Sequence, residues 1–351
     1  MLVINAILHF LIDGICAYSM FGKYGSYGAE GYLFYNFYAF SLQMPIGALC
    51  DLVVSRLKNR IIIKRFYWVV TLLGVLFTLL GMAVGFSALG VGNALFHVGG
   101  GLTSIREDEE RKLKGRGLGI FVAPGALGLF IGNTLSDYTF IATLVRGAFI
   151  VLVLSAVLAG FLRLYYAEKH LIFMEINASD SKARLKDSVF NLVLSAVICF
   201  VVVILRSYVG MAVGFSWKNG FVLGLIVTLS IVFGKVAGGF LAAKIGEFKA
   251  ALISLSAAAV FYVFSEIPVC GVLALFFFNM TMPITLYILI KRLPKLPGFS
   301  FGLLTFGLFI GFYMIYSDVK LPVSGNIVGA VGSVISALLL TVILIKKDKK
   351  S

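Results

Sequence analysis

The sequence has few charged residues: only 13% of its positions are Asp, Glu, Lys or Arg, whereas 60% are hydrophobic. A soluble domain cannot cover its surface with so little charge, and the mean hydropathy of +1.02 excludes that class. A hydrocarbon layer about 30 Å thick takes about 20 apolar residues per helix. Most of the 351 residues are therefore predicted to lie in membrane-spanning helices.

Signatures of catalysis and of metal binding are also missing. The four cysteines, Cys16, Cys50, Cys199 and Cys270, lie singly in apolar segments without the spacing of a zinc site or a disulfide framework. The sequence contains no recognisable nucleotide-phosphate loop, metal-ligand cluster or nucleophilic triad, which argues against an ATP-driven pump and a membrane hydrolase. We predict no enzymatic activity, no cofactor and no metal site.

Basic residues outnumber acidic ones by 30 to 16, which gives a net charge of +14. A nucleic-acid-binding protein would gather its Lys and Arg residues in a solvated patch. Here they lie between apolar runs, so we expect no nucleic-acid partner. The positions of these basic residues instead indicate how the chain is oriented in a lipid bilayer.

Apolar segments bounded by charged residues, glycine or proline predict an all-α membrane protein with twelve spans. Two pairs of neighbouring segments are separated by almost nothing polar, so each pair could have been miscounted. These pairs are 66–85 with 87–104 and 248–265 with 267–290. The predicted spans are 2–22, 31–51, 66–85, 87–104, 117–136, 143–163, 187–208, 219–243, 248–265, 267–290, 298–317 and 323–345.

Lys and Arg are distributed unequally between the two sides of this bundle. Most of the 30 lie in every second connection and in the C-terminal tail, as the positive-inside rule requires if both termini are cytoplasmic. Omitting one span would scramble the pattern, which supports an even number. We expect an integral protein of a bacterial plasma membrane, surrounded by membrane lipid. The exceptions are Lys23, Arg146, Arg206, Lys218 and Lys320 on the outer side and Lys235 within a span.

The longest polar interruption, from Tyr165 to Asp187, divides the spans into two sets of six. GALCD at Gly47–Asp51 and GFLAA at Gly239–Ala243 end the second span of their sets and form a weak internal repeat. Parallel repeats are one way in which transporters build two rocking halves. We predict an N-terminal half (1–164), a cytoplasmic linker (165–186) and a C-terminal half (187–351) with a short basic tail.

Several short segments combine glycines with polar or ionisable residues inside predicted spans. They are HFLID (His9–Asp13), GNALFHVGG (Gly92–Gly100), GALGLFIGN (Gly125–Asn133) and LRSYVG (Leu205–Gly210). These segments resemble motifs of the major facilitator superfamily, and more narrowly of its fosmidomycin-resistance-like efflux branch. The resemblance implies two pseudo-symmetric six-helix halves that move around a central site.

The connection after the second span, GALCDLVVSR, resembles a degraded form of the inner-loop signature of that superfamily. The resemblance implies a gating role for Asp51, Gly47 and Arg56: Asp51 would engage basic groups and the N-terminus of a neighbouring helix to lock the outward-facing state. Helix N-termini do favour carboxylates. Ordinary solvation of the loop is the alternative. Ala243 replaces the acid in the second half, so the two gates need not be equivalent.

Ionisable groups at bilayer depth cost a few kcal/mol, so each one within a span is a candidate functional residue. Asp13 and His97 both fall about 15 Å along their helices and are predicted to face one cavity, where they handle protons or contact substrate. His9 lies one turn from Asp13 and could pair with it, although a place near the inner interface would also explain it. A buried hydrogen bond is the alternative role for Asp13, and packing is the alternative for His97.

Three residues of the second half are candidates for the same cavity. Arg206 is expected to bind an anionic or polar substrate, or else to extend its guanidinium to water at the outer surface. Lys235, about 15 residues into the eighth span, must find a carboxylate, carbonyls or a wet cavity, either in a gating pair or in contact with substrate. Asn279 adds a neutral polar group at similar depth, unless it holds helices together.

The sequence therefore predicts a secondary transporter that exports a small organic compound, with proton coupling and alternating access, and that functions as a monomer. Two alternatives remain open. The first is an importer or facilitator of a polar or anionic metabolite that uses Arg206 and Lys235. The second is a non-transporting or lipid-handling membrane protein on the same fold, which the 32 phenylalanines make conceivable.

Overall fold

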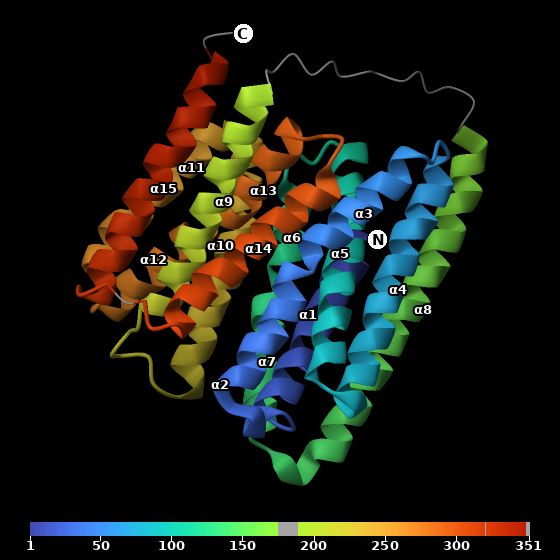
Figure 1. Ribbon diagram of the computed structural model, residues 1–351, viewed down its shortest axis with the longest axis horizontal. Coiled ribbons are helices and arrows are strands. Elements are labelled where there is room, and N and C mark those ends of the chain that lie inside the picture. Colours follow the sequence, from blue (N-terminus) through green and yellow to red (C-terminus); the bar gives the residue numbers. More distant parts are fainter. Residues whose placement is uncertain (175–188, 320, 349–351) are drawn as a thin grey trace.

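A computed structural model describes residues 1–174, 189–319 and 321–348, which form helices and contain no strand. Long apolar segments become helices because a backbone in lipid must satisfy its hydrogen bonds within the segment. The helices form two groups, one coloured blue to green and the other yellow-green to red in Figure 1. The two groups correspond to the two predicted halves.

The N-terminal half contains six membrane-crossing units, two of which are interrupted. The second is built from two helices joined by a π-helical turn, Phe37–Ser41. The fifth is interrupted at Ala123, after which Pro124 begins a new helix at a position that needs no backbone donor. The helices are α1 (Leu2–Phe21), α2 (Gly28–Asn36), α3 (Gln43–Ser55), α4 (Arg60–Val84), α5 (Phe86–Glu110), α6 (Arg116–Val122), α7 (Pro124–Ser136) and α8 (Ala142–Met174), with single 3-10 turns at Gly25–Tyr27 and Thr139–Ile141.

The C-terminal half repeats this arrangement with fewer interruptions. Its fourth unit consists of two helices that meet at Met280. The helices are α9 (Val189–Ala212), α10 (Gly220–Ile245), α11 (Glu247–Val263), α12 (Pro268–Asn279), α13 (Thr281–Arg292), α14 (Pro297–Tyr316) and α15 (Gly325–Asp348).

These units confirm the twelve predicted spans, including the two closely spaced pairs. In the first pair, α4 and α5 meet at Gly85, and in the second a turn separates α11 from α12. Ten units are long and apolar enough to cross a membrane; the other two are α5, which ends in charged residues, and α11, which has 17 residues. Several boundaries differ from the predicted ones: α4 begins at Arg60, α5 ends at Glu110, and α8 continues to Met174, within the range of the predicted linker. Residues 175–186 of that linker lie outside the described residues.

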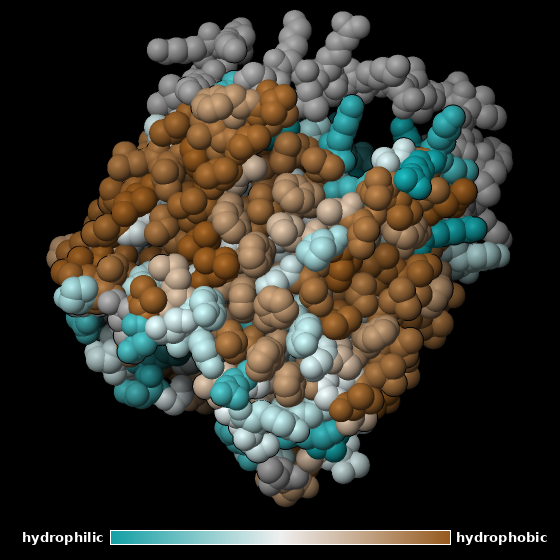
Figure 2. All heavy atoms as spheres, in the orientation of Figure 1, coloured by the Kyte–Doolittle hydropathy of each residue, from teal (hydrophilic) through white to brown (hydrophobic). Residues whose placement is uncertain are grey.

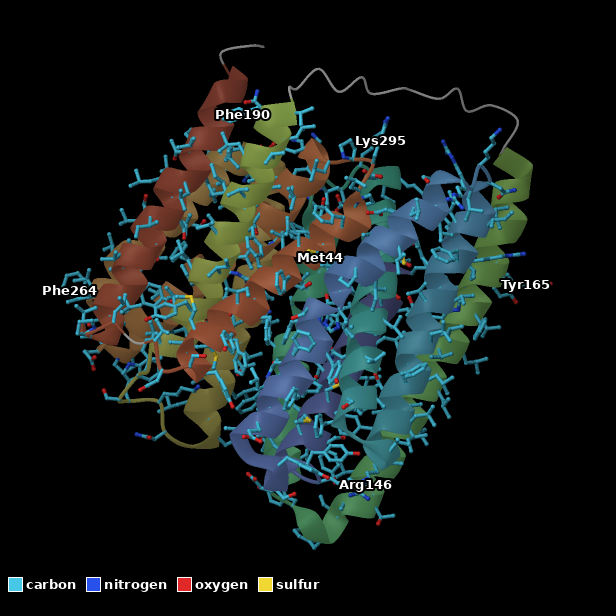
Figure 3. The ribbon with its side chains drawn as sticks, viewed as in Figure 1. Met44, Arg146, Tyr165, Phe190, Phe264 and Lys295 are labelled. Carbon is cyan, nitrogen blue, oxygen red and sulfur yellow. The ribbon has the colours of Figure 1, made fainter. Side chains whose placement is uncertain are left out.

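The first and the last described residues lie at the same end of the bundle, which we call the terminal end. The Met1 amine lies 3.0 Å from Glu107 in the last turns of α5, and α15 runs toward the same end. Figure 3 shows Lys295 at the terminal end and Arg146 at the opposite end. The even number of spans therefore returns the chain to the side on which it starts.

The outward faces of the helices are apolar. Large side chains such as Leu76 of α4, Leu158 of α8 and Leu338 of α15 are exposed, and Figure 2 shows brown hydrophobic surface over most of the visible face, with hydrophilic atoms gathered largely toward its ends. A surface of this kind would aggregate in water and is stable in lipid. The chain is an integral membrane protein.

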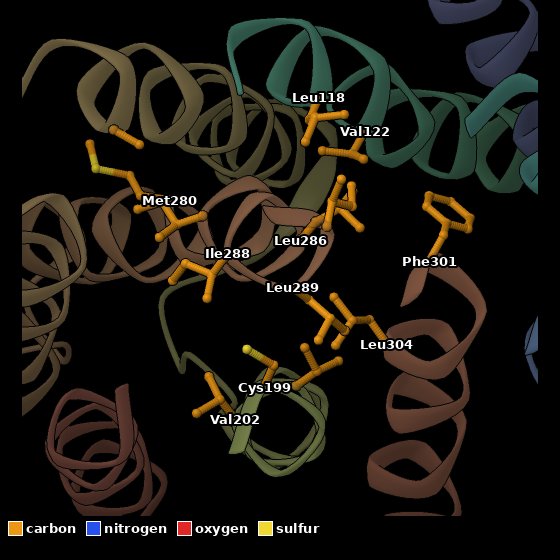
Figure 4. Close-up of a cluster of buried hydrophobic side chains, with 14 of the residues drawn as sticks. Leu118, Val122, Cys199, Val202, Met280, Leu286, Ile288, Leu289, Phe301 and Leu304 are labelled. Carbon is orange, nitrogen blue, oxygen red and sulfur yellow. The ribbon is translucent and has the colours of Figure 1, made fainter. Parts of the chain in front are cut away.

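The two halves meet along α3 with α14 and along α6 and α7 with α10. A cluster of buried apolar side chains fills the space between α6 of the first half and α9, α13 and α14 of the second (Figure 4). It includes Leu118, Cys199, Leu289 and Leu304. Apolar packing therefore closes part of the interface between the halves, and a cavity lies beside this closed part.

Candidate functional site: a cavity between the halves

A cavity of about 340 Å³ lies between the two halves and is lined by residues of α1, α5 and α7 on one wall and of α9, α10, α12, α13 and α14 on the other. Most of its surface is apolar, as is usual for sites that take small organic molecules. A few polar and ionisable side chains interrupt this surface. The six residues predicted to line a cavity all do so: Asp13, His97, His9, Arg206, Lys235 and Asn279.

Three of them, His9, Asp13 and His97, form a cluster on the N-terminal wall. His9 and Asp13 lie one turn apart on α1, with His9 Nε2 3.1 Å from Asp13 Oδ2. His97 comes from α5, and its Nε2 lies 3.7 Å from Asp13 Oδ1 and 2.9 Å from His9 Nε2. All three side chains are buried. We call this group the His–Asp–His cluster.

The hydrogen bonds around the cluster determine where protons can reside. His9 Nδ1 lies 2.6 Å from the Phe121 carbonyl and His97 Nδ1 lies 2.9 Å from the Asn93 carbonyl. Carbonyls only accept hydrogen bonds, so each Nδ1 carries a hydrogen. In two neutral imidazoles, the bare Nε2 lone pairs would then face each other across 2.9 Å. One proton shared with Nε2 or with Asp13 removes this repulsion, so the cluster has a place for a single proton.

Two further residues support the cluster. Asn93 Nδ2 donates to Asp13 Oδ1 at 3.0 Å. Gly125 of α7 leaves the necessary space, because a Cβ at that position would collide with both His9 and Asp13. Asn93 was not a predicted site residue. Its position one turn before His97 was the only sequence signal for it.

The same three side chains each offer one ligand atom, all within 4.8 Å of one another, a geometry that could hold a metal ion. Two imidazoles and a carboxylate suit divalent transition metals. The sequence pattern predicts no metal site, because the proximity of residues from different helices cannot be read from their spacing. However, two cationic side chains line the same cavity, and they oppose a divalent ion about twice as strongly as a proton, because the repulsion scales with the charge. The arrangement therefore suits a proton better than a metal ion.

Those cations, Arg206 of α9 and Lys235 of α10, line the C-terminal wall. Arg206 is only 9% exposed and its Nε atom has no hydrogen-bond partner, so the side chain does not extend to the outer surface. Within the described part of the chain, neither residue forms an ion pair. In this conformation the described residues provide no gating pair for Lys235, and that predicted role stays a prediction. Buried charges without partners are costly, which favours contact with a ligand.

Neutral polar groups complete the cavity. Asn279 Nδ2 donates to the Leu275 carbonyl at 2.9 Å, and Thr285 Oγ donates to the Thr281 carbonyl at 2.9 Å. Because the Thr285 hydroxyl and one of the two Asn279 amide N–H groups donate within their own helices, the side-chain oxygens can still accept and the second Asn279 N–H can still donate. Thr285 lines the cavity although the sequence analysis gave it no role.

Asp51 forms a contact between the halves at the terminal end. Its two carboxylate oxygens accept hydrogen bonds from the backbone N–H groups of Gly298 (2.9 Å) and Phe299 (2.8 Å), at the N-terminus of α14. Gly47 lies against Gly298 so closely that a Cβ on either would collide with the other backbone. Arg56 is exposed, and among the described residues its side chain has no hydrogen bond or ion pair. The structure thus places Asp51 and Gly47, but not Arg56, at this contact.

The symmetry-related contact, between α6 and α10, is built differently. The N-terminus of α6 is capped by Asp108, which accepts from Gly115 N (2.8 Å) and Gly117 N (2.7 Å) within the same half. Gly239 of α10 only packs against the Gly115 carbonyl. Ala243 offers no carboxylate. The described contacts between the halves thus include a carboxylate cap on one side, and close packing on the other.

We expect Gly47→Val to prevent closure at the terminal end, because its side chain cannot fit against the Gly298 backbone. Transport by the reconstituted protein should fall at least tenfold while the protein remains folded in the membrane. Gly147→Val is the matched control, since a Cβ at Gly147 meets no atom within 4 Å. Equal transport rates in the two variants would show that the close contact is not needed.

No family model and no curated protein matches this sequence. Solved structures do match its fold. The E. coli fucose:proton symporter has a TM-score of 0.57 at 12% identity and covers 97% of both chains. A bacterial homologue of the iron transporter ferroportin, in its outward-facing state, has a TM-score of 0.52 at 15% identity and covers 99% of this chain and 100% of that chain. The structure of that homologue with soaked iron has a TM-score of 0.58 at 16% identity and covers 98% of both chains. The chain has the major facilitator fold, with twelve membrane-crossing units among the described residues in two pseudo-symmetric halves.

Proposed function

We propose that the chain is a secondary transporter that moves a small organic compound across the membrane by alternating access and couples this movement to protons. One observation carries the proposal: a cavity between the halves has the His–Asp–His cluster on one wall and, on the other, two cations for which the described residues provide no ion pair. A ligand in this cavity touches both halves, so its binding can affect their movement. The fold alone hosts different functions, and the argument therefore rests on the site.

The alternative of a non-transporting or lipid-handling protein is less well supported. It would be favoured by a cavity filled with phenylalanine side chains. The observed cavity has a volume of about 340 Å³ and is lined by five ionisable side chains. Such groups are costly at bilayer depth and are typical of ion and substrate pathways.

Direction and substrate are supported by different features. The resemblance to the fosmidomycin-resistance-like branch favours export of a small organic compound. The unpaired Arg206 and Lys235 favour the alternative, a compound that carries negative charge. The similar fold of a fucose:proton symporter supports proton coupling in an architecture of this kind.

The test is transport by the purified protein in liposomes with an imposed pH gradient and an internal pH-sensitive dye. We expect proton flux that depends on an added organic compound from a panel of anionic, neutral and cationic members. The direction of compound movement relative to the proton gradient separates uptake from extrusion. If no panel member moves or binds, the proposal of a proton-coupled transporter of small organic compounds is contradicted.

We also infer that the terminal end faces the cytoplasm, because the basic connections lie at that end. Cysteines placed at the exposed positions Ser26 and Lys218 should react with an impermeant maleimide on intact cells, whereas a cysteine at Lys58 should not. The background should carry Cys270→Ser, since Cys270 is the one native cysteine that is not buried. Labelling at Lys58 without permeabilisation would reverse the orientation.

A further inference from the structure

We propose that the cavity binds an organic anion and a proton together, which makes the protein a symporter of the two. The proposal rests on the transport function proposed above and adds the substrate class and the sign of the coupling. Its basis is the placement of the His–Asp–His cluster and of the cations Arg206 and Lys235 on facing walls of one cavity.

The C-terminal wall has the chemistry of an anion site. Arg206 is buried with its Nε atom unsatisfied, and no described carboxylate pairs with it or with Lys235. A guanidinium binds carboxylates, sulfonates and phosphonates through parallel hydrogen bonds, and an ammonium adds a point charge. Apolar side chains such as Phe278 and Leu308 line the same cavity and would contact the body of the ligand. These features fit an organic anion with an apolar body.

The charged groups near the cluster decide how this anion affects protonation. Lys235 of α10 lies within electrostatic range of both Asp13 and His97, and also of Arg206. On the other side of Asp13 lie Cys16 and the Tyr35 hydroxyl, which are both neutral at physiological pH.

The remaining cavity walls add no charge. α7 contributes Gly125 next to the cluster, and α13 and α14 contribute Thr285 and Thr305, so the described side chains of these helices that line the cavity are uncharged. In the empty cavity, the two cations therefore oppose the arrival of a proton at the cluster. A bound monoanion cancels one of these two positive charges and weakens this opposition. By thermodynamic reciprocity, a proton on the cluster must strengthen anion binding by the same factor.

This coupling has the sign of symport. An antiporter requires that substrate and proton exclude each other, as a cationic substrate would do beside the cluster. Here each ligand favours the other. A proton and a monoanion also cancel in charge, so the loaded and the empty cavity carry the same formal charge. Transport should therefore be driven by a pH gradient and be insensitive to the membrane potential.

The experiment is calorimetric titration of the purified full-length protein with naphthalenesulfonate, whose charge does not change with pH. Titration in two buffers of different ionisation enthalpy gives the number of protons taken up per anion bound. We expect uptake of up to about one proton and up to about tenfold tighter binding for each unit by which the pH falls. Neutral naphthalenesulfonamide is the matched control ligand and should cause no proton uptake.

Substitutions of Lys235 test whether the proton uptake on anion binding arises in the cavity. Lys235→Met should weaken anion binding and largely remove the proton uptake, whereas Lys235→Arg should preserve both. Lys244→Met is the matched control, because Lys244 lies on the same helix but is exposed and outside the cavity. It should behave as the wild type.

Each other outcome counts against a defined part of the proposal. Proton release, or no proton change, on anion binding would overturn symport and leave a transporter of anions. Binding of neutral or cationic panel members without any binding of sulfonates, carboxylates or phosphonates would overturn the anion site. Failure of all ligands both to bind and to move in liposomes would overturn the proposed function itself.

Discussion

Asp13→Asn is expected to abolish uphill transport driven by a pH gradient while leaving the protein folded and able to exchange substrate downhill. The amide keeps the shape of the side chain and can still accept the hydrogen bond from Asn93. It cannot supply the negative charge that stabilises a proton between His9 and His97. A gradient of one pH unit supports at most about tenfold accumulation per proton in the wild type. In the variant this accumulation should be lost, so that the substrate only reaches equal concentrations inside and outside the liposomes.

Two further variants make the result specific. His97→Gln should shift the pH dependence with a milder loss, because His9 and Asp13 remain as a pair. Asp137→Asn removes a carboxylate from an exposed position of the same half and should leave uphill transport unchanged. Wild-type accumulation in Asp13→Asn would show that the cluster does not carry the coupled proton.

Much of the fold could be predicted from the sequence because the bilayer imposes simple constraints. A spanning helix needs about 20 apolar residues, and basic connections stay on one side of the membrane. The spacing of Lys and Arg therefore separated α4 from α5 and α11 from α12, where almost no polar residue marks the boundary. The end of α8 was misplaced because its later residues, which include Tyr165, are polar enough to resemble a loop although they continue the helix.

The composition of the cavity could be predicted in part. Depth along a helix follows from residue number, so Asp13 and His97 were expected at similar depth. The direction in which each side chain points depends on how the helices pack, which the sequence does not state. The 2.9 Å approach of His9 to His97 and the hydrogen bond from Asn93 are consequences of that packing, and so is the absence of an ion pair for Lys235 among the described residues.

The contacts between the halves at the terminal end could also be predicted only in part. Ala243 signalled that the acid is missing in the second half, but the sequence did not indicate that Asp108 caps α6 from within its own half. The cap depends on a turn that brings Gly115 and Gly117 back to Asp108. Of the two corresponding contacts between the halves, α3 with α14 and α6 with α10, only the contact at α14 thus uses a carboxylate. Removal of this carboxylate should therefore have a large effect.

Asp51→Ala is expected to open the terminal end, because it removes two charge-assisted hydrogen bonds to the N-terminus of α14. Their combined loss costs about 3 kcal/mol, which changes the ratio of closed to open forms about a hundredfold. Asp51→Asn should have a smaller effect, since the amide oxygen still accepts one bond. Both variants should transport more slowly than the wild type, because the closed form becomes harder to reach.

The opening can be measured separately from transport by a cysteine at Thr305, which lines the cavity. In a background without other cysteines, its labelling by a reagent added at the terminal end should accelerate in the order wild type, Asp51→Asn, Asp51→Ala. Asp108→Asn is the control, because it weakens a cap of similar geometry that does not cross between the halves. If Asp108→Asn accelerates labelling as much as Asp51→Ala, the effect reflects general loosening of the terminal end. If neither variant accelerates it, packing at Gly47 and Gly298 is sufficient to keep the halves closed, and Asp51 is not a gate residue.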